Sequence, residues 1–198
     1  MTPLDLFRAE GICTLPVDIK CIARRQGINI YTYREFGKMT RRNVRYLYNE
    51  YGPDGFSAVS SAGRRMIVYN EQRAPGRIRW TLAHEFAHHL LGHVVPASRG
   101  GTQSPEEREA DRFAKQLLAP LPVLFACEIH SAAEVARVTR LSVEASRYRL
   151  QDLTFYHPQS EYDLDMIDHF SPYIQCYREV CAPDMQDLMP YKYRVRVG

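Results

Sequence analysis

The chain carries two histidines, His84 and His88, four positions apart, with Glu85 directly after the first. On an α-helix, residues four positions apart lie about one turn apart on the same face, so both imidazoles can bind one metal ion. Glu85 then lies one step around the helix, where its carboxylate can act on a water molecule without being a ligand. The pattern predicts a zinc-dependent hydrolytic centre with two histidine ligands and a general base.

The segment around this motif is expected to be a buried helix. Gly92 is placed to end this helix. Apolar side chains surround the helix axis, namely Leu82, Phe86, Leu90, Leu91 and Val94. A helix that is apolar nearly all round is normally buried. Two buried histidines need polar partners, because an unpaired buried polar group costs about 1–3 kcal/mol. A metal ion is one such partner, and backbone hydrogen bonds to two core histidines are the alternative.

A second helix is expected over residues 104–120, the next acidic segment. Ser104 is a suitable N-cap, Pro105 fits the first turn, and Pro120 ends the segment. The apolar stripe of this helix consists of Ala110, Phe113, Ala114, Leu117 and Leu118. The stripe must face the protein core, so it fixes which acidic side chains point inward.

Catalytic zinc centres commonly take a third ligand from the protein, and Glu107 is our prediction for it. Glu107 lies at the edge of the apolar stripe, whereas Glu109 points toward Arg112 and solvent. We therefore expect that removal of Glu109 leaves the metal in place. Asp111, one turn after Glu107, can hydrogen-bond a ligating histidine. Two alternatives stay open: Glu107 serves only as a partner of the N-cap, or Glu109 is the ligand.

Three segments together resemble the ImmA/IrrE family of metallopeptidases. They are residues 64–70, 77–88 and 107–120, and the likeness extends over roughly residues 15 to 150. The resemblance implies an α+β, minimal zincin-like fold: a small antiparallel sheet beside the active-site helix, then a helical C-terminal segment. It also implies metal binding by the histidines of the motif and by Glu107. The chain departs from the family at Ala119, where Met is common.

Members of this family are associated with the cleavage or inactivation of helix-turn-helix repressors. The resemblance implies a zinc-dependent endopeptidase, with Mn²⁺ as the alternative metal, that makes a specific cut in such a repressor. Glu85 would take the proton of the attacking water and pass it to the leaving amine. The oxyanion-stabilising group stays open among His93, His130 and Tyr148. One sheet edge is expected to bind the substrate as an added strand.

The alternative function is a non-catalytic regulatory module that has the same fold and binds a repressor or DNA. In such a module the metal would have a structural role. The presence of Glu85 argues against this alternative, because a purely structural histidine pair has no need of that carboxylate.

Turn residues and periodicity divide the chain into three parts. Residues 1–125 are the expected zincin-like core, with strands near residues 28–33, 56–60 and 66–70 and a loop at 95–103. Residues 126–153 form a short segment that resembles a helix-turn-helix. Structural packing is the preferred role for this segment, because its second helix has little room for side chains that read DNA bases. Residues 154–198 form an extension of unassigned role, with an acidic helix expected at 163–169.

The composition bounds the remaining function classes. The net charge of +3 over 198 residues is modest, so direct nucleic-acid binding is not expected. The five cysteines form no compact framework and are expected to be reduced thiols, although Cys176 and Cys181 could form a redox pair or a second metal site. No signal peptide or membrane-spanning segment is visible, and we expect a cytoplasmic protein.

Overall fold

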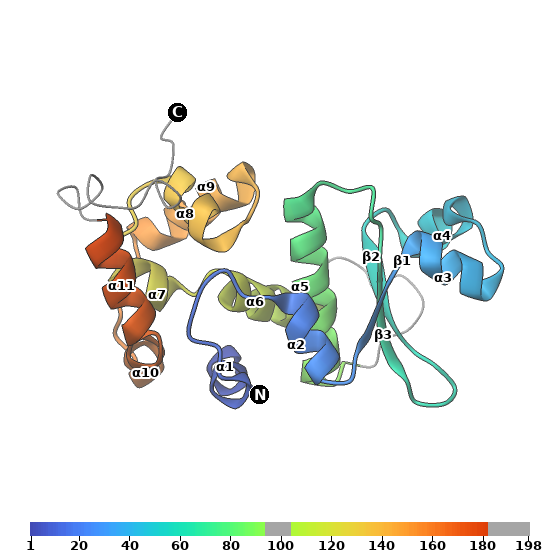
Figure 1. Ribbon diagram of the computed structural model, residues 1–198, viewed down its shortest axis with the longest axis horizontal. Helices are drawn as coiled ribbons and strands as arrows, with labels where there is room; N and C mark the ends of the chain where they lie inside the picture. The colour runs from blue at the N-terminus through green and yellow to red at the C-terminus, as the bar shows by residue number, and fades with distance from the viewer. Residues whose placement is uncertain (94–103, 182–198) are drawn as a thin grey trace.

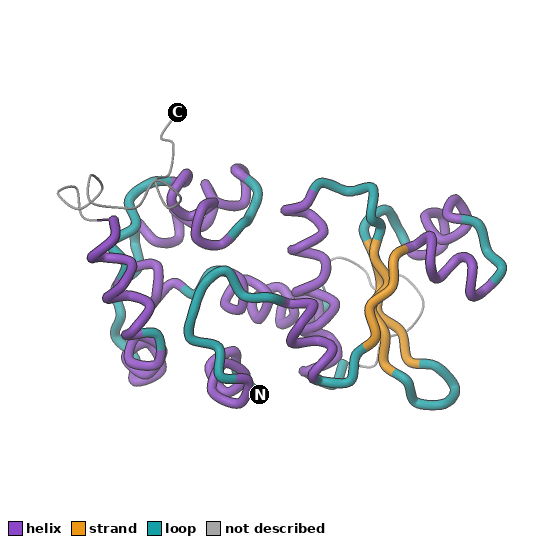
Figure 2. The backbone as a smooth tube through the Cα atoms, in the orientation of Figure 1, coloured by secondary structure: helices purple, strands orange, loops and turns teal. Residues whose placement is uncertain are grey.

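The computed structural model describes residues 1–93 and 104–181, so the loop expected at 95–103 lies outside the described residues. Figures 1 and 2 show an elongated molecule with a small sheet at one end and a group of helices at the other. The elements are α1 (Pro3–Glu10), α2 (Ile19–Arg25), β1 (Asn29–Thr32), α3 (Tyr33–Thr40), α4 (Val44–Tyr51), β2 (Gly55–Val59), β3 (Arg65–Tyr69), α5 (Pro75–Leu91), α6 (Pro105–Leu118), α7 (Leu121–Ala126), α8 (Ala132–Thr139), α9 (Val143–Thr154), α10 (Glu161–His169) and α11 (Ser171–Cys181).

The α+β fold class is confirmed, but the sheet is mixed and not wholly antiparallel. Its order is β1-β3-β2. Strands β2 and β3 form the expected antiparallel hairpin, whereas β1 runs parallel to β3. The difference arises because α3 and α4 lie between β1 and β2, and this long connection carries the chain to the other side of β3. Parallel pairing needs such a connection, and two helices supply it.

The two faces of the sheet pack against different helices, because successive side chains of a strand point to opposite faces. Phe56 and Val68 pack with Tyr33 and Leu47 of α3 and α4 in a small core of their own. Ile67 belongs instead to the main core with α2 and α5. Figure 1 shows α3 and α4 on one side of the sheet and α5 on the other. The sheet therefore presents one face of β2 and β3 to the motif helix.

The first motif helix ends where the sequence predicts, and the second begins where the sequence predicts. Helix α5 has a proline in its first turn and ends at Gly92, whose φ of 70° lies in the left-handed region that glycine adopts without strain. In α6, Ser104 caps the N-terminus by accepting a hydrogen bond from the backbone N–H of Glu107 at 3.2 Å. The predicted apolar stripe of α6 is buried. These two helices pack against each other and fix the relative positions of the motif residues.

The C-terminal helices α10 and α11 pack into the main core. Met166, Phe170 and Ile174 are buried there, and the Phe170 ring meets that of Phe7 edge to face with centroids 5.1 Å apart. Asp165 also accepts a hydrogen bond from Arg8 of α1 at 2.9 Å. The helix expected at 163–169 is thus present, and it ties the extension to the N-terminus. The three-part division of the chain stays a prediction.

The segment that resembles a helix-turn-helix, α8 and α9, uses one of its arginines for packing. The Arg149 side chain is only 8% exposed and donates to the carbonyl of Ala119 at 2.8 Å. It is therefore not presented to a nucleic acid. Cys13, Cys21, Cys127 and Cys176 form no disulfide bond in the described part of the chain. None of the helices in the described ranges has the length and apolar character that a membrane-spanning segment needs.

Candidate metal centre

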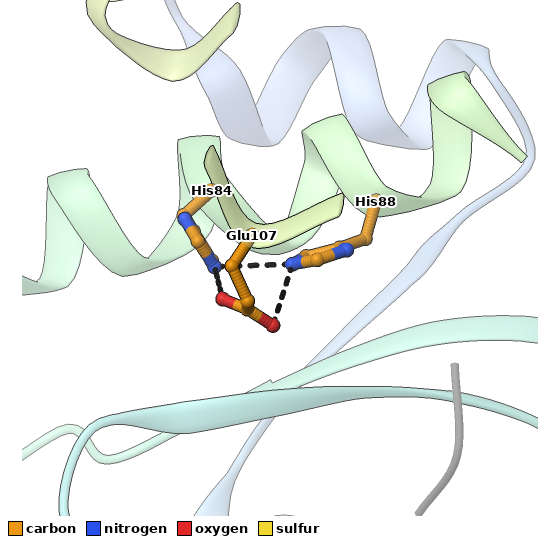
Figure 3. Close-up of side chains that lie close together, drawn as sticks. All are labelled: His84, His88 and Glu107. Carbon is orange, nitrogen blue, oxygen red and sulfur yellow. Dashed lines mark hydrogen bonds and ion pairs between the residues drawn. The ribbon is translucent and has the colours of Figure 1, made fainter. Parts of the chain in front are cut away.

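The two motif histidines and Glu107 come together where α5 faces the first turn of α6 (Figure 3). His84 Nε2 lies 3.1 Å from Glu107 Oε2, and His88 Nε2 lies 3.5 Å from Glu107 Oε1. The two Nε2 atoms are 3.1 Å apart. One ligand atom from each of the three residues lies within 4.8 Å of the others. Two imidazole nitrogens and a carboxylate oxygen thus converge on one point.

The hydrogen bonds behind this cluster suit a cation at that point. His84 Nδ1 lies 2.9 Å from Asp111 Oδ1, so Nδ1 carries the proton that this contact needs and Nε2 presents a lone pair. The Nε2 lone pair then faces His88 Nε2 and a carboxylate oxygen, which are acceptors as well. A divalent metal would bind these acceptor atoms and remove the repulsion between them. Two imidazoles with one carboxylate are the ligands of catalytic zinc sites.

Glu107, not Glu109, lies beside the two imidazoles, as the edge of the apolar stripe predicts. The backbone N–H of Glu107 bonds the Ser104 hydroxyl, while its carboxylate turns toward the histidines. Glu109 instead has Oε2 at 3.3 Å from His93 Nε2. Asp111 contacts His84 at Nδ1, and His84 is one of the two histidines that the sequence offers as its partner. Because the Glu107 carboxylate lies against the two histidines, it does not act as a capping partner of Ser104.

A family model described as the IrrE N-terminal-like domain, Peptidase_M78, matches residues 23–151, more than half of the chain. The chain belongs to this family. Membership confirms the predicted resemblance and supports a metallopeptidase-type role. The match covers the sheet, both motif helices and most of α9. No curated protein and no solved structure matches the chain.

In this member of the family the motif glutamate, Glu85, is held by a residue that the motif does not reveal. The Ser57 hydroxyl lies 2.5 Å from Glu85 Oε2 and 3.1 Å from the Glu85 carbonyl oxygen. Ser57 is 1% exposed and belongs to the face of β2 that meets α5. Burial raises the pKa of Glu85, and the Ser57 hydrogen bond and nearby His84 oppose that rise. A raised carboxyl pKa suits a group that must accept and then release a proton.

Sequence reasoning missed Ser57. Its signal is a single hydroxyl among apolar residues in a short strand, a pattern that a satisfied core serine shares. Only the packing of β2 against α5 shows that Ser57 bonds Glu85.

Replacing Ser57 with Ala is expected to lower the rate of hydrolysis about tenfold and leave metal binding unchanged. The substitution leaves the Glu85 carboxylate without its neutral donor, and such a loss typically costs about 1–3 kcal/mol. The effect should fall on kcat more than on KM, because Ser57 lies behind Glu85 and is buried. Steady-state kinetics would measure it, with the exposed turn residue Ser61→Ala as the control. An unchanged kcat would exclude this role for Ser57.

The neighbouring histidines His88 and His89 in the last turn of α5 have different environments. Burial is the largest cause that lowers the pKa of His88 to about 4, and the nearby His84, His93 and His89 contribute to the same shift. His88 is therefore neutral at pH 7, the form that binds a metal. His89 is also buried, but its Nε2 lies 3.0 Å from the Met66 carbonyl of β3, to which it donates. His89 is thus a core histidine bonded to backbone, the arrangement considered as an alternative for the motif pair.

A cavity of about 990 Å³ lies beside Trp80, near the N-terminal end of α5. Trp80 is among its lining residues and lies one turn before His84, with the two ring centroids 6.4 Å apart. The other walls come from α6 and α9 and include Lys115, Tyr148 and Gln151. Of the oxyanion candidates, Tyr148 lines this cavity and is 62% exposed. His130 lies ahead of α8, where its backbone N–H bonds Glu134.

Proposed function

We propose that the chain is a zinc-dependent endopeptidase that makes a specific cut in a helix-turn-helix transcriptional repressor. The observation that carries this proposal is the meeting of His84, His88 and Glu107 beside the partly buried Glu85, in a chain of a peptidase family.

Each side chain of the site has a distinct role in the proposed reaction. His84, His88 and Glu107 would hold the metal, and Mn²⁺ is the alternative to Zn²⁺. Once bound, the metal would supply Lewis-acid chemistry that activates water and polarises the scissile carbonyl. Glu85 takes a proton from the attacking water and delivers it to the leaving amine. Ser57 holds the Glu85 carboxylate in one orientation, which limits the conformations the base must sample.

Two surfaces are available to a polypeptide substrate. Strand β2 is an edge strand of the described sheet and carries Ser57, so an extended segment added to this edge would lie close to Glu85. The cavity beside Trp80 adds surface beyond the cut bond. A folded partner can contact both, which supports selection of one protein over peptides in general.

The repressor as substrate is supported by the family, whose members are associated with inactivation of such proteins. The chain is expected to act in the cytoplasm, where a protease must be restrained by its choice of substrate. The non-catalytic alternative assigns no role to the hydrogen bond between Ser57 and Glu85, since a structural metal needs neither residue.

The test is cleavage of the repressor encoded beside this chain. Metal-loaded protein is incubated with that repressor, and intact-mass spectrometry identifies the products. We expect two fragments from a single cut, no cut with Glu85→Gln, and poor cleavage of casein or short peptides. Efficient digestion of unrelated proteins with the repressor left intact would contradict the specific role. Absence of cleavage from every substrate would contradict the peptidase role.

A further inference from the structure

Behind the metal ligand His88, a histidine and a carboxylate form a chain of contacts that no motif assigns. His93 Nδ1 lies 2.9 Å from His88 Nδ1, and His93 Nε2 lies 3.3 Å from Glu109 Oε2. We propose that His93 and Glu109 are positioning residues that orient the imidazole of His88 and fix its tautomer for metal binding. The inference rests on the proposed metal centre but not on the choice of substrate.

The proton positions follow from the chemistry of imidazole. A histidine that binds a metal through Nε2 must carry its proton on Nδ1. His88 Nδ1–H therefore donates to His93 Nδ1, which must be unprotonated to accept. The remaining His93 proton is then on Nε2, which faces the Glu109 carboxylate and donates to it. A single assignment satisfies both contacts, and it leaves the Nε2 lone pair of His88 directed at Glu107 and His84.

The backbone holds His93 where this contact requires it. Helix α5 ends at Gly92 in the left-handed conformation, and the N–H groups of both Gly92 and His93 donate to the carbonyl of His88, the latter at 3.1 Å. This turn brings the His93 ring back toward His88, with ring centroids 5.0 Å apart. The His93 side chain is only 8% exposed, so water does not compete freely for its nitrogens.

The two metal-binding histidines thus have matched support from α6. Asp111 accepts from His84 Nδ1 directly, whereas Glu109 supports His88 through one intervening imidazole. Such carboxylate partners orient a ligand and raise its basicity, and their loss typically costs about 10–100-fold in metal affinity. The proposal replaces our sequence expectation for Glu109: the residue is no ligand, yet its removal should weaken metal binding.

The test is the Zn²⁺ affinity of variants, measured by competition with a chromogenic chelator. His93→Phe keeps the bulk of the ring and removes both contacts, and we expect affinity about 10–100-fold lower. His93→Asn should retain most of the affinity, because its side-chain oxygen can accept from His88 Nδ1–H near the position of the lost nitrogen. Glu109→Gln should lower affinity less, since Glu109 is 53% exposed. Glu106→Gln, an exposed carboxylate on the same helix, is the matched control and should change nothing.

A purely structural role for His93 would give a different pattern. Phe would then preserve affinity better than Asn, and both variants would change the unfolding midpoint of the metal-free protein. Wild-type affinity in a folded His93→Phe protein would overturn the proposal. If His93→Phe does not fold, equal affinities of Glu109→Gln and Glu106→Gln would overturn it, and a weaker Glu109→Gln would support it. Normal zinc binding without any cleavage would contradict only the proposed function.

Discussion

Replacing Glu85 with Gln is expected to lower peptide hydrolysis by about 10²–10⁴-fold, the typical contribution of a general base. The amide keeps the size of the carboxylate and can still accept the Ser57 hydrogen bond, but it cannot take a proton from water at neutral pH. The metal should stay at full occupancy, because the predicted ligands are His84, His88 and Glu107. Initial rates on the cleaved partner and the zinc content of the same preparation measure both effects.

The control for Glu85→Gln is Glu106→Gln, which carries the same chemical change at an exposed site on α6. This variant should cleave at the wild-type rate, which excludes a general effect of charge. Residual hydrolysis must also be shown to require the purified variant and not a contaminating protease. Wild-type rates in a metal-loaded, pure Glu85→Gln protein would show that another group acts as the base.

Replacing Glu107 with Ala is expected to empty most of the metal centre. The substitution removes the one carboxylate that lies between the two imidazoles, and two histidines alone make a poor zinc site. The helix cap should survive, because Ser104 bonds the backbone N–H of residue 107 and not its side chain. We therefore expect low zinc stoichiometry with nearly unchanged stability of the metal-free protein.

Zinc content by elemental analysis and unfolding in urea separate the two roles of residue 107. Loss of a cap would lower the free energy of unfolding by about 1 kcal/mol and leave the zinc stoichiometry unchanged. Loss of a ligand would lower the zinc stoichiometry and leave the stability of the metal-free protein nearly unchanged. Glu106→Ala is the matched control, one residue earlier in the same turn. Full zinc occupancy in Glu107→Ala would mean that a different residue completes the centre.

The sequence predicted that His84, His88 and Glu107 lie close together, because the patterns that place them are local. Ser104 and Pro105 mark the start of the second motif helix, and Gly92 marks the end of the first. Once both helices are placed, the i, i+4 spacing puts His84 and His88 on one face, and the apolar stripe of α6 selects Glu107 over Glu109. Family resemblance then supplied the fold class, which the structure confirms.

The features that escaped prediction depend on contacts between distant segments. The parallel pairing of β1 and β3 requires knowledge of where α3 and α4 place the chain, and strand periodicity carries no such information. The hydrogen bond between Ser57 and Glu85 joins residues 28 positions apart, and it forms because β2 packs against α5. His93 was one of three oxyanion candidates, whereas its ring nitrogens face His88 and Glu109 because Gly92 turns the chain back.

The measurement that tests the central claim most directly is a crystal structure of the metal-loaded protein with anomalous diffraction data collected at the zinc edge. The account predicts one strong anomalous peak, with His84 Nε2, His88 Nε2 and a Glu107 oxygen at about 2.0–2.2 Å from it. The fourth position should be open to water, with the Glu85 carboxylate beside it. A peak elsewhere in the protein, or a closed site of four protein ligands, would contradict the account.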